Sequence, residues 1–237
     1  MPNHFSVIIP AAGRSVRFGG PRNKLQETLG GQTVIQRAAD AFLRRADVIS
    51  VLIATTPPRP GETVPPPIAA NESRIIFTPG GANRAESVLL ALKQVSPAVE
   101  WVAIHDAARP LVSDELISRT LAAARQYGAA VPAMPVQLTV KQADGPLPAR
   151  VQRTIPRQSL WAMQTPQIMR RAALLAAYEK CQLPLEQITD DVQLLELAGE
   201  EVWLVAGEER NLKITTQADL KLAEMFLSAP GQRAKSE

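Results

Sequence analysis

The sequence predicts an α/β protein, a three-layer α/β/α sandwich around a mostly parallel sheet. Short apolar runs rich in β-branched residues alternate along the chain with amphipathic stretches of helical period. The runs are apolar throughout, which is typical of strands that helices cover on both faces. Parallel strands joined through helices make right-handed crossovers, and such connections place helices on both sides of one sheet.

The first elements carry clear local signals. The apolar run at 5–10 leads directly into Ala11-Ala12-Gly13, so it predicts a buried strand that ends in a loop. Thr33 followed by Gln36 predicts a capped helix start. Residues 57–67 contain six prolines in eleven positions, a composition that predicts a surface loop within a crossover connection.

The alternation continues to residue 136. Asn83 is expected to begin a helix, with Glu86 at the capping-box position, and Ser113 to begin a longer helix that ends near Tyr127. The strands between these helices are apolar runs of five to eight residues. They are expected at 49–54, 74–78, 101–105 and 129–136.

The pattern changes at 138–160, where two short strand-like runs flank Ala143-Asp144-Gly145-Pro146. This arrangement predicts a β-hairpin arm. An isolated hairpin is marginally stable in water, so we expect the arm to pack against a second copy of the chain in a homodimer. The remaining chain predicts helices at 170–180, 190–198 and from Thr216, a strand at 202–206 and a flexible tail at 228–237.

Length and composition exclude several classes of protein. The 237 residues, 46% hydrophobic and 21% charged, fit a single domain over 1–237 rather than a disordered chain. With one cysteine, Cys181, and two histidines, the chain cannot build a thiolate or imidazole zinc cage. A net charge of +3 predicts no nucleic-acid partner. No apolar run approaches the roughly 18 residues of a membrane span, so we expect no membrane association. The single Cys181 cannot form an internal disulfide, so we expect a reducing, cytoplasmic location.

The segments that follow the predicted strands are where an open parallel sheet binds its ligands. After the first strand, the small residues at 10–13 allow close approach of the backbone, and Arg17 and Lys24 can neutralise phosphate charge. This predicts a polyphosphate loop, although a glycine-rich turn with solvated basic residues has the same composition. The segment is neither G-x-G-x-x-G nor a Walker A loop.

Two further segments have the same placement. Gly80-Gly81 lies between a strand and a helix start, where Ser87 can reach a base or ribose; a tight turn with a helix cap is the alternative. His105-Asp106 ends a central strand. A carboxylate there is costly unless it is paired, so Asp106 is a candidate ligand for magnesium or a substrate hydroxyl, or an ion-pair partner of Arg109.

Together these segments resemble the 2-C-methyl-D-erythritol 4-phosphate cytidylyltransferase family. The resemblance runs from Val7 to about Leu227. It is carried by Pro10-Ala11-Ala12-Gly13 with Arg17 and Lys24, Gly80-Gly81 with Arg84 and Ser87, His105 to Pro110, Pro135-Val136 with Thr139, Arg157 with Leu160-Trp161, Thr165-Pro166-Gln167, Ile188-Thr189-Asp190, and Asn211 with Lys213.

The resemblance implies a Rossmann-like sheet of the nucleotidyltransferase type and transfer of CMP from CTP to a branched tetritol phosphate, with release of pyrophosphate, in non-mevalonate isoprenoid synthesis. It implies Mg²⁺ on the triphosphate and a homodimer joined by the 138–160 arm. The implied catalytic residues are Arg17, Lys24, Arg157 and Lys213. The implied nucleotide-binding residues are Ala11, Ala12, Gly13, Gly80, Gly81 and Ser87, and those for the acceptor are Asp106, Arg109, Thr139 and Thr165, with Thr139 and Arg157 serving the partner subunit's site.

Other functions share parts of this pattern. A ribitol-5-phosphate cytidylyltransferase would keep the nucleotide loops and differ at the polyol end, near Leu138 and the run before Lys213. A nucleotide-binding regulatory protein would keep the pocket without turnover. A dinucleotide dehydrogenase is disfavoured because its glycine fingerprint is missing.

A few polar and aromatic residues have a simpler expected role. Asp190 and Asp191 stand at a helix start, where carboxylates favour the helix dipole. The three tryptophans lie in or near apolar runs, so we expect them in the core: Trp101, Trp161 and Trp203.

Overall fold

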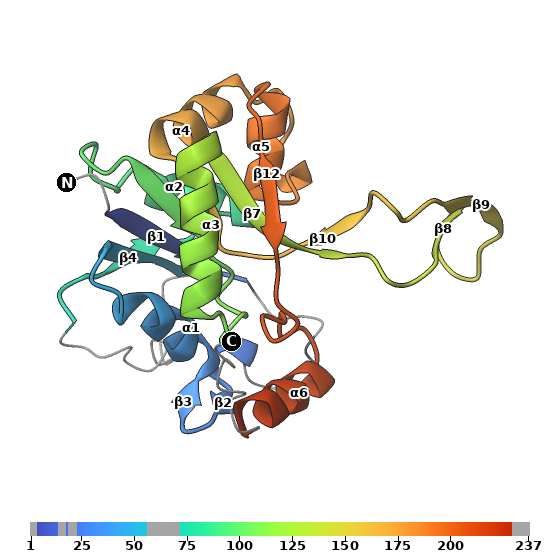
Figure 1. The fold of residues 1–237 in the computed structure, drawn as a ribbon, viewed down its shortest axis with the longest axis horizontal. Coiled ribbons are helices and arrows are strands. Elements are labelled where there is room, and N and C mark those ends of the chain that lie inside the picture. Colours follow the sequence, from blue (N-terminus) through green and yellow to red (C-terminus); the bar gives the residue numbers. More distant parts are fainter. Residues whose placement is uncertain (1–3, 14–17, 19–22, 56–71, 229–237) are drawn as a thin grey trace, which may run out of the picture.

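A mixed eight-stranded sheet forms the centre of the computed structural model, which describes residues 4–13, 18, 23–55 and 72–228 (Figure 1). The strand order is β10-β7-β11-β6-β1-β4-β5, and β12 pairs with β7. The strands are β1 (Phe5–Pro10), β4 (Val48–Thr55), β5 (Ile75–Pro79), β6 (Trp101–Ile104), β7 (Ala129–Pro135), β10 (Trp161–Met163), β11 (Gln167–Arg170) and β12 (Trp203–Ala206).

Most of this sheet is parallel, as predicted. The pairs β1–β4, β1–β6, β4–β5 and β12–β7 are parallel, whereas β11 lies antiparallel between β6 and β7, and β10 is antiparallel to β7. The sequence analysis predicted no strand at β10 or β11. Each has only three or four residues, and β11 owes its conformation to β6 and β7, the two strands that it pairs with.

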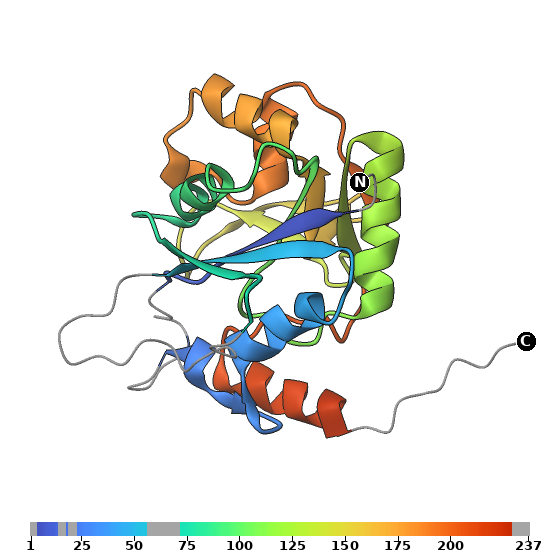
Figure 2. The same cartoon turned by 90° about the vertical axis from the view of Figure 1, so that its left-hand side faces the viewer.

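Helices cover both faces of the sheet, which confirms the three-layer prediction (Figure 2). In β1, Val7 and Ile9 belong to the core on one face, and Ile8 belongs to the core on the other. The helices of the first face are α1 (Val34–Leu43) and α3 (Asp114–Tyr127), and those of the second are α2 (Arg84–Leu92), α4 (Arg171–Lys180) and α5 (Asp191–Leu197).

A smaller layer lies beyond α1. The hairpin of β2 (Thr28–Leu29) and β3 (Gln32–Thr33) follows the short 3₁₀ helix η2 (Lys24–Gln26), and α6 (Gln217–Ser228) packs beside β2 (Figure 1). A second 3₁₀ helix, η3 (Leu185–Gln187), precedes α5. The C-terminal segment therefore lies close to the segment that precedes α1.

The predicted helix starts are confirmed by their caps. The side chains of Thr33, Asn83 and Ser113 each accept a hydrogen bond from the backbone amide three residues later, at 3.3, 2.8 and 3.0 Å. Such caps satisfy amides that have no partner within the helix. The cap at Asn83 fixes the first turn of α2 directly after the loop that leaves β5, and this loop borders the site described below.

The predicted hairpin is present. Strands β8 (Val140–Ala143) and β9 (Val151–Ile155) pair antiparallel and extend away from the sheet (Figure 1). Its apolar side chains are exposed, Leu138 to 81% and Leu147 to 89%. The arm therefore has apolar surface that its own chain does not cover.

Some predictions cannot be compared with the structure, and two of the tryptophan predictions are wrong. The proline-rich loop at 57–67, Arg17 and the tail beyond residue 228 lie outside the described residues. Of the helices formed by the described residues, none is long and apolar enough to cross a membrane. Trp101 is buried as predicted, but Trp161 and Trp203 are 45% and 43% exposed, because both lie on short strands that do not enter the core.

Candidate active site

Three loops that follow parallel strands meet at one cavity of about 320 Å³. They come from the carboxyl ends of β1, β5 and β6, where open sheets of this kind bind ligands. The structure brings most of the predicted nucleotide residues together on this cavity. They are Ala11, Ala12, Gly13, Gly81 and Ser87, joined by Lys24, Asp106 and Lys213.

Gly80, the remaining predicted nucleotide residue, does not line this cavity but packs against Ala12, which does. A Cβ atom on Gly80 would lie 2.4 Å from the Cβ atom of Ala12, so only glycine lets the β5 loop approach the β1 loop this closely. The next amide, of Gly81, donates to Oγ of Ser87 at 3.0 Å, and that hydroxyl donates to the carbonyl of Asn83 at 2.8 Å. The loop is thus held against the start of α2.

Asp106 carries the densest set of charges in the site. Its Oδ2 atom lies 2.9 Å from Nζ of Lys213 and 3.4 Å from Nε of Arg109, and its Oδ1 atom lies 3.4 Å from Nε of Arg84. Burial opposes ionisation, but Arg84, then Lys213 and Arg109, hold the pKa of Asp106 well below its usual range. The predicted ion pair with Arg109 is therefore present, as one of three.

The backbone of Asp106 is fixed by its neighbour His105. Nε2 of His105 lies 3.0 Å from the carbonyl oxygen of Arg109, so we assign its proton to Nε2. Nδ1 then accepts from the hydroxyl of Thr165 at 3.0 Å, and the same hydroxyl accepts from the amide of Asp106 at 3.0 Å. Complete burial lowers the pKa of His105 to about 4, so the ring is neutral at pH 7.

A second cavity of about 310 Å³ adjoins the first. Arg84, Asp106 and Lys213 line both, so these three side chains form the wall between them. The predicted acceptor residues Arg109 and Thr165 line the second cavity and not the first. Thr189, Asp190, Gln164 and Gln167 add further hydrogen-bonding groups there.

The C-terminal segment completes the wall. Nζ of Lys24 donates to the carbonyl of Ile214 at 2.9 Å, and the amide of Ile214 donates to the carbonyl of Ala108 at 2.8 Å. Nη1 of Arg109 donates to the carbonyl of Asn211 at 2.7 Å. Lys213 therefore lies on a short segment that is held on both sides.

Two predicted residues lie apart from this wall. Thr139 and Arg157 belong to the arm region and line neither cavity of their own chain; Arg157 donates to the carbonyl of Gln137. Arg17 lies outside the described residues.

The sequence analysis did not identify Arg84, Gln167 or Asp191 as residues of the site. Arg84 appears in the family pattern, but its place between two carboxylates cannot be seen there. Asp190 and Asp191 stand together at a helix start, a pattern that indicates a helix cap. Asp190 does form the cap, but the contact of Asp191 with Arg84 cannot be predicted from that pattern.

The charged groups here do not form a metal cage. Within residues 4–13, 18, 23–55 and 72–228, no three His, Cys, Asp or Glu side chains gather in a group that could hold a metal ion. Asp106 is one carboxylate, with a cation on each oxygen. Mg²⁺ in phosphate-transfer sites commonly uses one or two carboxylates together with phosphate oxygens, so the donor set fits an ion that a triphosphate carries in.

Comparison with known proteins agrees with the geometry. The family model for 2-C-methyl-D-erythritol 4-phosphate cytidylyltransferase, IspD, matches residues 5–229. A curated relative of that name from Frankia casuarinae is 38% identical over 236 residues, covering 98% of this chain and 85% of the relative. The chain is also 37% identical to a bifunctional IspD/IspF enzyme of Desulfotalea psychrophila, where it spans 56% of the relative's length.

Solved structures give the same result. The crystal structure of 2-C-methyl-D-erythritol 4-phosphate cytidylyltransferase from Thermus thermophilus is 36% identical, with a TM-score of 0.76 over 94% of this chain and 98% of that chain. The enzyme of that name from Francisella tularensis is 28% identical, with a TM-score of 0.79 over 94% and 99%. The sheet order, the three strand-end loops and these matches agree, and the chain belongs to the 2-C-methyl-D-erythritol 4-phosphate cytidylyltransferase family.

Proposed function

We propose that the two adjoining cavities carry out the reaction of this family, transfer of the cytidylyl group from CTP to 2-C-methyl-D-erythritol 4-phosphate. The observation that supports this most directly is the wall that the two cavities share, formed by Arg84, Asp106 and Lys213. A transfer between two bound molecules needs two sites that meet at the reacting atoms.

CTP would occupy the first cavity. Its small-residue loops at 11–13 and 80–81 allow the backbone to lie close to a base, a ribose and phosphates. The acceptor would occupy the second cavity, where the carboxylate of Asp106 and the hydroxyl of Thr189 offer partners to hydroxyl groups.

The reaction is an in-line displacement at phosphorus. A phosphate oxygen of the acceptor forms a bond to the α-phosphorus of CTP, and the bond from that phosphorus to the bridging oxygen breaks, so pyrophosphate leaves with the electron pair. The attacking oxygen is already anionic and needs little base catalysis. The protein supplies position and positive charge, from Lys24 on the nucleotide side and Lys213 on the acceptor side, with Arg17 as predicted from the family pattern.

We propose that Mg²⁺ enters with CTP rather than binding the free protein. Such an ion neutralises charge on the phosphates to which it is bound. Because Asp106 is the single carboxylate in the wall and is already paired with cations, the free protein should bind Mg²⁺ weakly. Calorimetry should detect Mg²⁺ binding with CTP present and little without it; tight binding to the free protein would contradict this proposal.

We further propose that the arm joins two subunits and that Thr139 and Arg157 complete the partner's acceptor site. The exposed apolar side chains of the arm and the position of both residues outside their own chain's cavities support this. A cytoplasmic location, expected from the single Cys181, stays a prediction.

Pyrophosphate release tests the activity. The protein is incubated with Mg²⁺ and CTP plus 2-C-methyl-D-erythritol 4-phosphate, ribitol 5-phosphate or no alcohol. Release with the first alone is expected. Release with ribitol 5-phosphate alone would keep the fold and change the acceptor, and no release with either would indicate a different acceptor or a site that only binds.

A further inference from the structure

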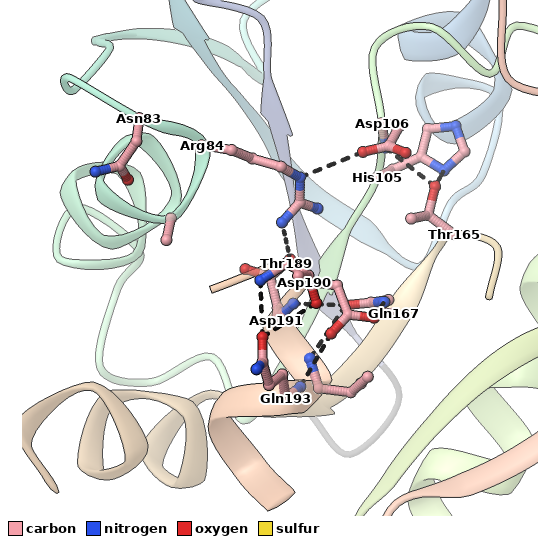
Figure 3. A network of polar contacts seen from close by, with 12 residues as sticks. Asn83, Arg84, His105, Asp106, Thr165, Gln167, Thr189, Asp190, Asp191 and Gln193 are labelled. Atoms are coloured by element: carbon pink, nitrogen blue, oxygen red, sulfur yellow. Dashed lines mark hydrogen bonds and ion pairs between the residues drawn. The ribbon is translucent and has the colours of Figure 1, made fainter. Parts of the chain in front are cut away.

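A second carboxylate lies behind the wall of the site. Asp191, the first residue of α5, is fully buried, and its Oδ2 atom accepts a hydrogen bond from Nη1 of Arg84 at 2.7 Å. Nε of the same guanidinium lies 3.4 Å from Oδ1 of Asp106 (Figure 3). Arg84 therefore bridges an interior carboxylate and the carboxylate that separates the two cavities.

The fold fixes Asp191 independently of Arg84. Oε1 of Gln167, a buried residue of β11, accepts from the amides of Asp191 and Val192 at 3.0 and 3.2 Å. Nε2 of Gln167 donates to Asp190 at 3.0 Å, and Asp190 accepts from the amide of Gln193 at 3.0 Å (Figure 3). The two adjacent carboxylates thus have different roles, because Asp190 caps the helix and Asp191 turns inward.

The carboxylate of Asp191 determines how strongly Arg84 interacts with Asp106, because the guanidinium contacts both carboxylates. Burial raises the pKa of Asp191, and the guanidinium of Arg84, 2.7 Å away, opposes that rise and favours the charged carboxylate. In turn, although burial opposes it, Asp191 and then Asp106 hold the pKa of Arg84 well above its ordinary value. With Asp191 in place, the guanidinium is shared between two carboxylates. Without that charge, Arg84 would act on Asp106 alone and compete with Lys213, which lies 2.9 Å from the same carboxylate.

We infer that Asp191 is a positioning residue for the acceptor site, which acts through Arg84 to fix the carboxylate of Asp106 and the ammonium of Lys213. The inference rests on the proposed function, because it assigns the second cavity to the acceptor. Asp191 itself lines neither cavity, so it does not touch either substrate.

The first test is Asp191→Asn, which removes the charge and keeps the size of the side chain. We expect KM for the acceptor to rise about ten-fold or more, with KM for CTP within about two-fold of wild type. Arg84→Lys keeps the positive charge and loses the fork that reaches two carboxylates, so it should raise KM for the acceptor as well; because Arg84 also lines the first cavity, the comparison with KM for CTP is made on Asp191→Asn. The double variant should be no worse than the more impaired single variant, because both substitutions break one bridge.

The matched control is Glu196→Gln, the same change of carboxylate to amide on the exposed side of α5. It should leave both KM values unchanged. Loss of a buried ion-pair partner also destabilises a protein, so melting is measured and kinetics are run well below each midpoint. An acceptor KM within about two-fold of wild type in folded Asp191→Asn or Arg84→Lys, or an equal rise in both KM values in Asp191→Asn, would overturn the inference.

A crystal structure of Asp191→Asn, or of Arg84→Lys if the first variant does not fold, gives a readout independent of turnover. We expect the contact between Asp106 and Lys213 to open. If that contact is unchanged, the inference is wrong even when the wild-type protein shows no cytidylyl transfer. Absence of wild-type transfer with an opened contact would instead count against the proposed function alone.

Discussion

At the scale of single residues, the site depends on neutral groups as much as on charged ones. His105 lines neither cavity, yet its ring accepts a hydrogen bond from the hydroxyl of Thr165, and that hydroxyl accepts one from the amide of Asp106. The ring also packs edge-on against Phe42, with centroids 5.0 Å apart. Such a buried ring holds its neighbours only while it stays unprotonated.

His105 should make stability depend on pH. Its pKa is lowered from 6.5 to about 4, so between these values the unfolded chain binds a proton that the folded chain does not. The free energy of unfolding should therefore fall as pH drops from about 6.5 to 4, by on the order of 3 kcal/mol. Urea denaturation across this range should show a shallower pH slope in His105→Gln; equal slopes in both proteins would contradict the prediction.

Lys24 should serve the chemical step more than nucleotide binding. Its ammonium is held 2.9 Å from the carbonyl of Ile214 and lines the first cavity, where the proposed reaction would build up charge on the transferring phosphate. We expect Lys24→Ala to slow single-turnover transfer about 10²- to 10³-fold while CTP affinity changes less than about ten-fold. A loss of CTP affinity in proportion to the loss of rate would show a role in binding only.

At the scale of elements, the hairpin arm and the strand-end loops contrast in how they reach their positions. The loops are held by caps and close backbone contacts within one chain, as at Gly80 and Asn83. The arm pairs only with itself among the described residues, and it leaves Leu138 and Leu147 exposed. A partner subunit would cover that apolar surface and bring Arg157 to a site.

Mixing two impaired variants tests this sharing. Arg157→Ala and Lys213→Ala should each lose most of their activity alone. If sites are shared across a dimer, refolding the two together should restore about a quarter of wild-type activity, because half of the dimers are mixed and each has one intact site. Activity no higher than that of the separate variants would mean that Arg157 does not complete the site of the partner subunit.

At the scale of the whole molecule, the features that could be predicted from the sequence are those that depend on residues close together in the chain. Capped helix starts such as Thr33 and Ser113 depend on residues three positions apart, and they were found in place. Strand β11 could not be predicted, because its four residues become a strand only between β6 and β7. The inward contact of Asp191 is with Arg84, 107 residues away in the sequence, and no local pattern shows it.

The contact between Lys24 and Ile214 joins segments 190 residues apart in the sequence. A chain that ends at residue 210 keeps every strand of the main sheet but lacks Lys213 and the segment that supports it. We expect this chain to show no rise in melting temperature with CTP, whereas a chain that ends at residue 228 should respond as the full chain does. A full CTP response from the shorter chain would contradict this.

The same contact has a consequence for biosynthesis. The ribosome makes the loops at 11–13 and 80–81 and every strand of the main sheet before it reaches Lys213, so a nascent chain has its sheet before it has a complete site. Truncated products of interrupted translation would therefore fold in part without consuming nucleotide. Competence for catalysis is acquired only once translation has passed Lys213.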